Sequence, residues 1–578
     1  MKRYDPRFFG VLAVALLALC SASPPALAGT LLFSGGFDEP AEGPYNDYEA
    51  SRFLSQATFG ATLPEIRRLR MIGYNAWLNE QFAMPLTAHL PYLQNLQAQQ
   101  IDIYHNIRNE VWMQRAMTAP DQLRQRVMFS LSEILVTSDQ SGALEGQPFG
   151  LTHYYDMLGT GAFGNYRALL GNVTLHPVMG HYLSMFGNRK PDPSINLRPD
   201  ENYAREIMQL FSIGLVQLNL DGTPVLAAGQ PVPTYNQDTI AGFAHVFTGW
   251  KWFDCPANNW QWCGPGDTGA GWLQPMGANL EFHAVEGTKQ LLNYPGVVLP
   301  GGVMPAGNRP TATVQTVRDN MNTALNNIFN HPNVGPFLSK LLIQRLVSSN
   351  PSPAYVQRVA TVFNNNGSNV RGDLRAVIRA ILLDSEARAR PAANTTRGKL
   401  REQPLRWTQI WRAFGANDPD GRLDDWYIHW PYHTPVSVLH SPTVFNFYLP
   451  NYAAPGPDVA QAGLRSPEFQ IETDTFVTRF NNLLSWFASD LHSGAVPSDY
   501  DGVRLDFTRE KQLAGNVDQL LEHLDMLLMG GTMSPSMRTI LRTHLNSIPV
   551  GDYFGEGYRR TTDAISLIVT SPEYAIEK

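Results

Sequence analysis

A short stretch of the sequence holds the side-chain types that proton transfer and substrate orientation require. Four polar residues follow the spacing of a single helical face, with intervals of three, four and seven from the first: Asn202, Arg205, Glu206 and Gln209. A carboxylate held against a guanidinium stays ionised, so it could orient a substrate, accept a proton or bind a cation. The same residues could instead close two helices as an ion pair, where desolvation offsets the attraction. Both interpretations stay open.

His283 and Lys289 form a second candidate group, in a segment rich in Gly, Pro, Trp and Asn. A histidine near a lysine could serve proton transfer or anion binding, whereas a single loop histidine is usually solvated. Long irregular connections often carry function. We therefore predict a site between the helix at 201–209 and the loop at 250–290. Its candidate catalytic residues are Asn202, Arg205, Glu206, His283 and Lys289.

Other histidines give weaker signals. His429 and His433 have a zinc-like interval if helical, but the Trp-Pro-Tyr sequence between them favours a loop. His176 and His181 could join Glu206 in a cation site, although no spacing rule demands it. The metal requirement stays open. The sequence contains no Gly-x-Ser-x-Gly nucleophile motif and no glycine-rich phosphate loop followed by lysine.

Cysteines and tryptophans gather close to the second candidate group. Cys255 and Cys263 stand eight positions apart in a Pro- and Asn-containing loop, and a metal site would need further ligands. We predict a disulfide between them, as in an oxidising compartment. Four tryptophans cluster at 250, 252, 260 and 262. They could stack on sugar rings or pack around the disulfide loop, and packing is the favoured interpretation.

The elements that would position these residues are mainly helical. Pro199 and Asp200 suit the start of a helix, and Gly214 suits a left-handed residue after its end. Two helices joined by a Gly/Pro break are predicted within 51–82. Periodicity predicts further helices at Ile103–Met117, Gln122–Thr137, Phe163–Leu170, Val178–Phe186, Gln237–Thr248, Val314–Phe329, Pro336–Val347, Pro353–Asn364, Gly372–Leu383, Thr475–Leu491, Asn516–Met529, Ser534–His544 and Tyr558–Val569.

The N-terminus is typical of a secretory signal peptide. Lys2, Arg3 and Arg7 form a basic head, residues 8–19 an apolar core, and Ala26-Leu27-Ala28 a small-residue cleavage site. We expect cleavage after Ala28, with an uncleaved anchor as the alternative. No later stretch reaches about 18 uninterrupted apolar residues, so no membrane span is expected after cleavage. The predicted location is periplasmic or secreted.

Length and composition limit the classes of protein. The chain has 578 residues, of which 43% are hydrophobic and 16% charged, enough for a large globular core. Its net charge of −7 argues against a nucleic-acid partner, because phosphate binding needs a basic face. We predict a signal peptide at 1–28, a linker at 29–49 and a single mainly helical domain at 50–578. A loop-rich insertion at 215–310, in which short strands are possible, interrupts that domain.

Several separated segments resemble a bacterial family catalogued as domain of unknown function 1800. They are Arg52-Phe53-Leu54-Ser55-Gln56-Ala57-Thr58-Phe59-Gly60, Glu201-Asn202-Tyr203-Ala204-Arg205-Glu206, Phe247-Thr248-Gly249-Trp250, His440-Ser441-Pro442-Thr443-Val444 and Ser571-Pro572-Glu573-Tyr574. The resemblance spans about residues 50–578. It implies a secreted, mostly helical protein, often encoded beside a sulfatase-like partner, and implies no chemistry.

One position departs from the family pattern. The pattern is similar to His-Asp followed by Lys, but here Ala284 follows His283, and Glu286 is the nearest acid. Two functions therefore remain. The first is an exported hydrolase of an extracellular polymer or ester. The second is a non-catalytic envelope protein whose Trp-rich loops hold a glycan or a protein partner.

Overall fold

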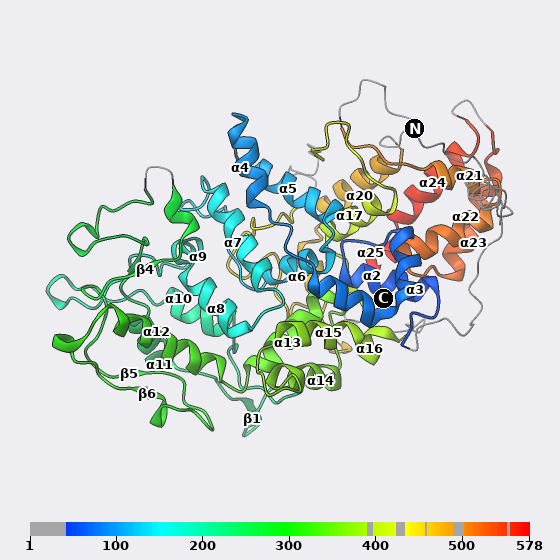
Figure 1. Ribbon diagram of the computed structural model, residues 1–578. Helices are drawn as coiled ribbons and strands as arrows, with labels where there is room; N and C mark the ends of the chain where they lie inside the picture. The colour runs from blue at the N-terminus through cyan, green and yellow to red at the C-terminus, as the bar shows by residue number, and fades with distance from the viewer. Residues whose placement is uncertain are drawn as a thin grey trace, which may run out of the picture. The chain divides into compact units, whose positions relative to one another are not determined.

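The computed structural model describes residues 42–266, 269–389, 397–423, 434–456, 459, 461–489, 502–551 and 555–578 (Figure 1). The predicted signal peptide lies outside the described residues, as do most of the predicted linker and the pair His429 and His433. The first described helix begins at Asp47, three residues before the predicted start of the helical domain. Within the described residues, no helix is both long enough and apolar enough to cross a membrane.

The first half of the chain is helical, as predicted. Its helices are α2 (Asp47–Ala57), α3 (Leu63–Ala83), α4 (Leu90–Ala98), α5 (His105–Thr118), α6 (Gln122–Ser132), α7 (Pro148–Gly161), α8 (Tyr166–Leu175), α9 (Pro177–Tyr182) and α10 (Asn202–Gln209). Side chains of Asn46 and Thr62 cap α2 and α3, which explains where these helices start. Gly73 lies at φ 80° and breaks α3 in its middle. Helices α4 and α7 were not predicted.

The loop-rich insertion contains short antiparallel strand pairs, which confirms the predicted character of this region. The pairs are β1 (Leu226–Ala227) with β2 (Gln230–Pro231), β3 (Trp250–Lys251) with β4 (Gly277–Ala278), and β5 (Lys289–Gln290) with β6 (Val303–Met304). One helix, α11 (Gln237–Val246), packs against both α10 and β5. It therefore separates the two groups of candidate residues, which lie on either side of it in the chain.

The second half returns to helices. They are α12 (Val314–Phe329), α13 (Val334–Leu346), α14 (Pro353–Asn364), α15 (Leu374–Leu383), α16 (Ser385–Arg388), α17 (Gln403–Ala413), α20 (Asp474–Ser489), α21 (Thr508–Leu513), α22 (Val517–Leu524), α23 (Pro535–Ser547), α24 (Tyr558–Val569) and α25 (Pro572–Ala575). The predicted helix at Asn516–Met529 ends in a π-helical turn, η7 (Asp525–Met529). The fold class is mainly α, as the sequence indicates.

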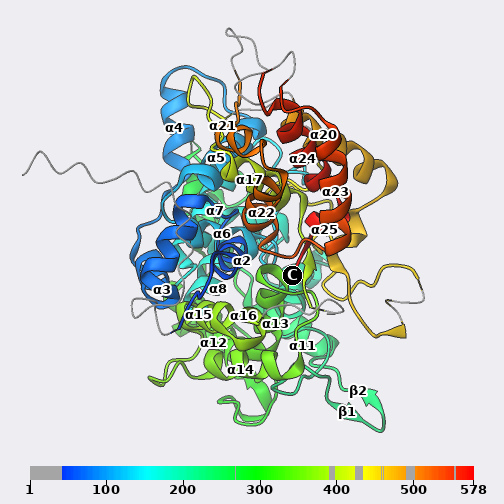
Figure 2. The same cartoon turned by 90° about the vertical axis from the view of Figure 1, so that its right-hand side faces the viewer.

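The start and the end of the described chain pack together. Helix α2 contacts η7, and the Arg52 guanidinium donates to the carbonyl of Gly530 at 3.0 Å. Strand β7 (Lys399–Leu400) pairs with β8 (Ile576–Glu577). Figures 1 and 2 show the blue α2 beside segments from the orange and red end of the chain. One large apolar cluster runs through both halves and includes the buried rings of Trp77, Trp407 and Trp411.

Candidate functional site

Helix α10 carries the predicted polar stripe, but its ion pair differs from the expected one. The Arg205 guanidinium pairs with Glu201, one turn earlier, at 3.3 Å, and both side chains are partly exposed. Glu201 also accepts hydrogen bonds from the Gln237 amide of α11, at 2.9 and 2.8 Å. Asn202 is exposed at the start of the helix. This stripe therefore closes the seam between α10 and α11, and Arg205 does not hold the Glu206 carboxylate in an ion pair.

Glu206 is buried, with only 6% of its surface exposed. Among the described residues, its Oε2 atom has no hydrogen-bond partner, and neither has the buried hydroxyl of Tyr235. Burial raises the pKa of Glu206, and the charge of Arg205 only partly opposes this. Burial and the Glu206 charge raise the pKa of Tyr235 to about 12. A buried carboxyl group of this kind can keep its proton near neutral pH, contrary to the expected ionised carboxylate.

His283 has the surroundings of a structural histidine. Its ring is fully buried, and burial lowers its pKa to about 4. Nδ1 lies 2.9 Å from the carbonyl oxygen of Thr248, and Nε2 lies 2.9 Å from the amide nitrogen of Asn320. A neutral ring that donates from Nδ1 and accepts at Nε2 satisfies both contacts. Both nitrogens are thus engaged in holding the turn after α11 against α12.

Lys289 is also engaged within the fold. Its buried Nζ donates to the carbonyls of Val285 and Gly287, at 3.3 and 3.2 Å, and burial lowers its pKa. Ala284, at the position where the family pattern has an acid, is buried. The nearby acid, Glu286, forms an ion pair with Arg309 at the surface, and the hydrogen bond from Arg309 lowers the pKa of Glu286 to about 2. The structure therefore does not bring Lys289 and Glu206 into one site.

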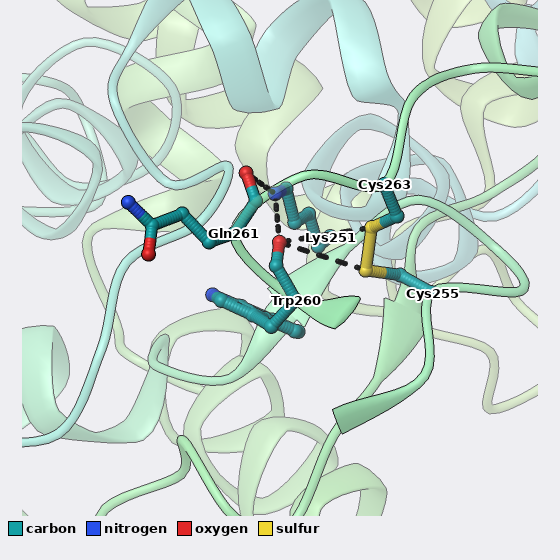
Figure 3. Close-up of a disulfide and its surroundings, with 5 residues drawn as sticks. All are labelled: Lys251, Cys255, Trp260, Gln261 and Cys263. Atoms are coloured by element: carbon teal, nitrogen blue, oxygen red, sulfur yellow. Dashed lines mark hydrogen bonds between the residues drawn. A yellow bond between two sulfur atoms is a disulfide. The ribbon is translucent and has the colours of Figure 1, made fainter. Parts of the chain in front are cut away.

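The disulfide and the packing role of the tryptophans are as predicted. Cys255 and Cys263 are bonded, with their Cα atoms 5.7 Å apart (Figure 3). The Lys251 ammonium donates into the closed loop, to the carbonyls of Trp260 and Gln261. The rings of three tryptophans in the cluster are buried: Trp250, Trp252 and Trp260. The fourth, Trp262, is 80% exposed. His181 stacks on Phe186, with ring centroids 3.9 Å apart, and burial lowers its pKa to about 4.

A buried cluster of charges, which the sequence reading missed, lies between α6, α13 and α17. The Glu133 carboxyl group hydrogen-bonds to that of Glu402, and Lys399 Nζ lies 3.6 Å from Glu402. Burial, and then the Glu402 charge, raise the pKa of Glu133 well above its usual range. Burial also raises the pKa of Glu402, but Lys399, the Glu133 hydrogen bond and Arg345 together lower it. Glu133 thus holds the proton, and Glu402 is the ionised partner.

Four histidine–carboxylate pairs occur in the described part of the chain: His89–Asp156, His440–Asp139, His523–Glu510 and His544–Asp563. In the first and third pairs, both side chains are buried or nearly so, and in the fourth both are well exposed. Among these pairs, His440–Asp139 alone combines a buried carboxylate, 5% exposed, with a partly open imidazole, 28% exposed. A buried carboxylate can orient the ring while the ring still reaches solvent.

Asp139 is fixed by two partners. His440 Nδ1 hydrogen-bonds to Oδ1, and Arg108 Nη2 lies 2.5 Å from Oδ2. Burial raises the pKa of Asp139, but the Arg108 charge and the His440 hydrogen bond outweigh it, so the net shift is downward. Arg108 also donates to the carbonyl of Val438, two residues before His440. The Asp139 amide donates to the carbonyl of Leu439 at 3.0 Å. The carboxylate is thus ionised and bound to the chain on both sides.

The backbone before His440 is strained. Leu439 has a φ of 55°, in the left-handed region that residues with branched side chains rarely adopt, and its side chain is buried. Such conformations are kept only where the surrounding contacts determine them, and they are common at functional sites. The sequence gave one relevant signal, the His440-Ser441-Pro442 segment, but it gave no sign of Asp139, 301 residues away. Within the described residues, no group of acidic, histidine and cysteine side chains could hold a metal ion.

The fold and these residues define a mainly helical protein with one partly open histidine–carboxylate pair. A family model described as "Protein of unknown function (DUF1800)" matches residues 52–576. The chain belongs to this family, which confirms the resemblance seen in the sequence. Comparisons with curated proteins and with solved structures give no match.

Proposed function

We propose that the protein is an exported hydrolase in which His440 is the general base that activates water. The observation that carries the proposal is the pairing of a buried, ionised Asp139 with a partly open His440 ring. The other three histidine–carboxylate pairs of the described chain lack that combination. The expected substrates are esters or polymers outside the cytoplasm.

Each contact has a role in this chemistry. Because Nδ1 donates its proton to Asp139, Nε2 is the nitrogen left to accept a proton from water. The water oxygen then attacks the carbonyl or glycosidic carbon, and the leaving group departs with a proton returned by the imidazolium. Asp139 stabilises the imidazolium that forms in between. Arg108 is a positioning residue, since it touches Asp139 and the Val438 carbonyl rather than the imidazole.

Chromogenic esters and polysaccharides, tested with the purified mature protein, provide the assay. For a substrate that is turned over, we expect His440→Gln and Asp139→Asn each to lower kcat by about 100-fold or more. His544→Gln is the matched control, because it removes an exposed histidine–aspartate pair elsewhere. Equal losses in all three variants, or full activity in His440→Gln, would contradict the proposal.

A binding role is the second candidate, and one observation favours it. Trp262 on the disulfide-closed loop is 80% exposed, and the nearby Phe253 is 55% exposed. Exposed aromatic rings on a covalently closed loop could stack on a glycan without losing much conformational freedom. We expect Trp262→Ala to weaken retention on cell-envelope polysaccharide, with Phe469→Ala, an exposed aromatic residue elsewhere, as control. The sulfatase-like partner stays a prediction that the same variant can test by co-purification.

A further inference from the structure

A polar hollow of about 800 Å³ lies at the C-terminal end of α13, apart from the residues discussed so far. Its walls come from three parts of the chain: the end of α13 with the turn at 348–352, the segment around α16, and residues 463–465. The volume is within the range of small-molecule sites in proteins. Polar side chains dominate the wall, so a hydrophilic ligand would fit better than an apolar one.

The charges on the wall are mainly positive. Lys340, Arg397 and Arg465 contribute cations, and Glu386 is the one acid among the described lining residues. Glu386 is already engaged, because it accepts hydrogen bonds from the Ser352 amide at 3.0 Å and from the Ser352 hydroxyl at 2.5 Å. The three cations therefore outnumber the acid, whose oxygens serve the start of α14.

Lys340 shows the effect of this crowding. Its side chain is accessible to solvent, yet the protein around its ammonium group lowers its pKa, and the charge of Arg465 lowers it further. Neighbouring cations repel each other, and an anion between them would relieve that repulsion. An accessible ammonium group beside a second cation is therefore suited to an anionic ligand.

The wall is held in place by hydrogen bonds before any ligand arrives. Asn350 Nδ2 donates to the Arg465 carbonyl at 2.8 Å, and the Arg465 amide donates to Asn350 Oδ1 at 2.7 Å. Arg397 Nη1 donates to the Glu386 carbonyl at 3.0 Å. The buried Gln344 amide joins the wall to the carbonyls of Ser349 and Pro450, both at 3.0 Å. A preorganised wall loses less entropy when it binds a ligand.

We propose that this hollow binds a hydrophilic anion through Lys340, Arg397 and Arg465. The recognised group is a phosphate, a sulfate or a carboxylate, either free or as part of a larger polar molecule. Arginine and lysine are the side chains that bind such groups, with arginine able to donate two parallel hydrogen bonds. The site shares no residue with His440 and Asp139, so it stands or falls separately from the proposed hydrolase.

Calorimetric titration of the full mature chain at low ionic strength tests the site. Inorganic phosphate is the first probe and glucuronate the second, which separates phosphate-like from carboxylate recognition. We expect saturable binding of at least one probe, weakened about tenfold or more by Arg465→Gln and by Lys340→Gln. Arg465→Lys keeps the charge, so it should bind more tightly than Arg465→Gln.

Lys511→Gln is the matched control. Lys511 lines a second described hollow of about 500 Å³, in which it is accompanied by Glu556. We expect this variant to bind both probes as the unaltered protein does. The proposal is overturned if neither probe binds saturably, if the Arg465 and Lys340 variants bind unchanged, or if Lys511→Gln weakens binding equally. Circular dichroism spectra of the variants establish that they retain the helical fold.

Discussion

Glu206 and His283 are two side chains whose protonation is set by burial. Glu206 loses most of its contact with water and gains no hydrogen bond to Oε2 from the described residues, so the protonated form is favoured. His283 keeps two hydrogen bonds that suit a neutral ring. Sequence spacing identified both residues as chemically capable. It could not show that one would hold a proton and the other would refuse one.

The pKa of Glu206 predicts how stability depends on pH. A carboxyl group whose pKa is raised in the folded state stabilises the fold below its unfolded pKa, near 4.5, and that contribution is lost as pH rises through the folded value. Gln cannot lose a proton, so Glu206→Gln should gain stability relative to the unaltered protein as pH rises above 4.5. Urea unfolding across this pH range measures the difference.

Glu201→Gln is the control for that experiment, because it removes a partly exposed carboxylate from the same helix. A difference between Glu206→Gln and the unaltered protein that stays constant with pH would show that Glu206 titrates as it does in the unfolded chain.

Helix α11 links the two regions that the sequence assigned to one site. Gly242 on this helix lies so close to β5 that a Cβ atom there would be 1.9 Å from the Gln290 carbonyl oxygen. The approach explains why a helix interior keeps a glycine despite its low helix propensity. It also explains why Lys289, next to Gln290, is buried and directed to its own turn.

Gly242→Ala should therefore destabilise the protein, by about 3 kcal/mol, since helix and strand must move apart. Gly171→Ala in α8 is the matched change in a helix interior with room for the methyl group, whose nearest neighbour is the flexible end of Arg167 at 3.3 Å. It should be neutral or stabilising by up to about 1 kcal/mol. Similar losses of unfolding free energy in both variants would contradict the close contact of α11 and β5.

The whole molecule is tied together by the buried charges under α13 and α17. Lys399 Nζ donates to the Arg345 carbonyl at 2.6 Å and lies beside the ionised Glu402. Lys399→Met would leave Glu402 charged without its nearest cation, at a cost of about 3–5 kcal/mol. Glu133→Gln keeps a neutral hydrogen-bond donor in place of the protonated carboxyl, so we expect a loss within about 1 kcal/mol. Urea unfolding at pH 7 compares them, and equal losses would contradict the assignment of the proton to Glu133.

Local patterns predicted much of the fold and little of the site. Helices α12 and α14 have the predicted limits, because their apolar periodicity and proline or threonine start signals are local. The predicted helix at Gln122–Thr137 ends at Ser132 instead, since Glu133 and Asp139 turn away to meet charges from the second half of the chain. Contacts between residues some 300 positions apart leave no spacing to read in the sequence.

Chemical modification tests the central claim, that His440 is the working base, most directly. The protein is treated with diethyl pyrocarbonate, acylated histidines are mapped by mass spectrometry, and the remaining hydrolytic activity is followed over time. We predict that activity is lost in step with acylation of His440, and that acylation of His544 has no effect on the rate. Full activity in protein whose His440 is completely acylated would contradict the account.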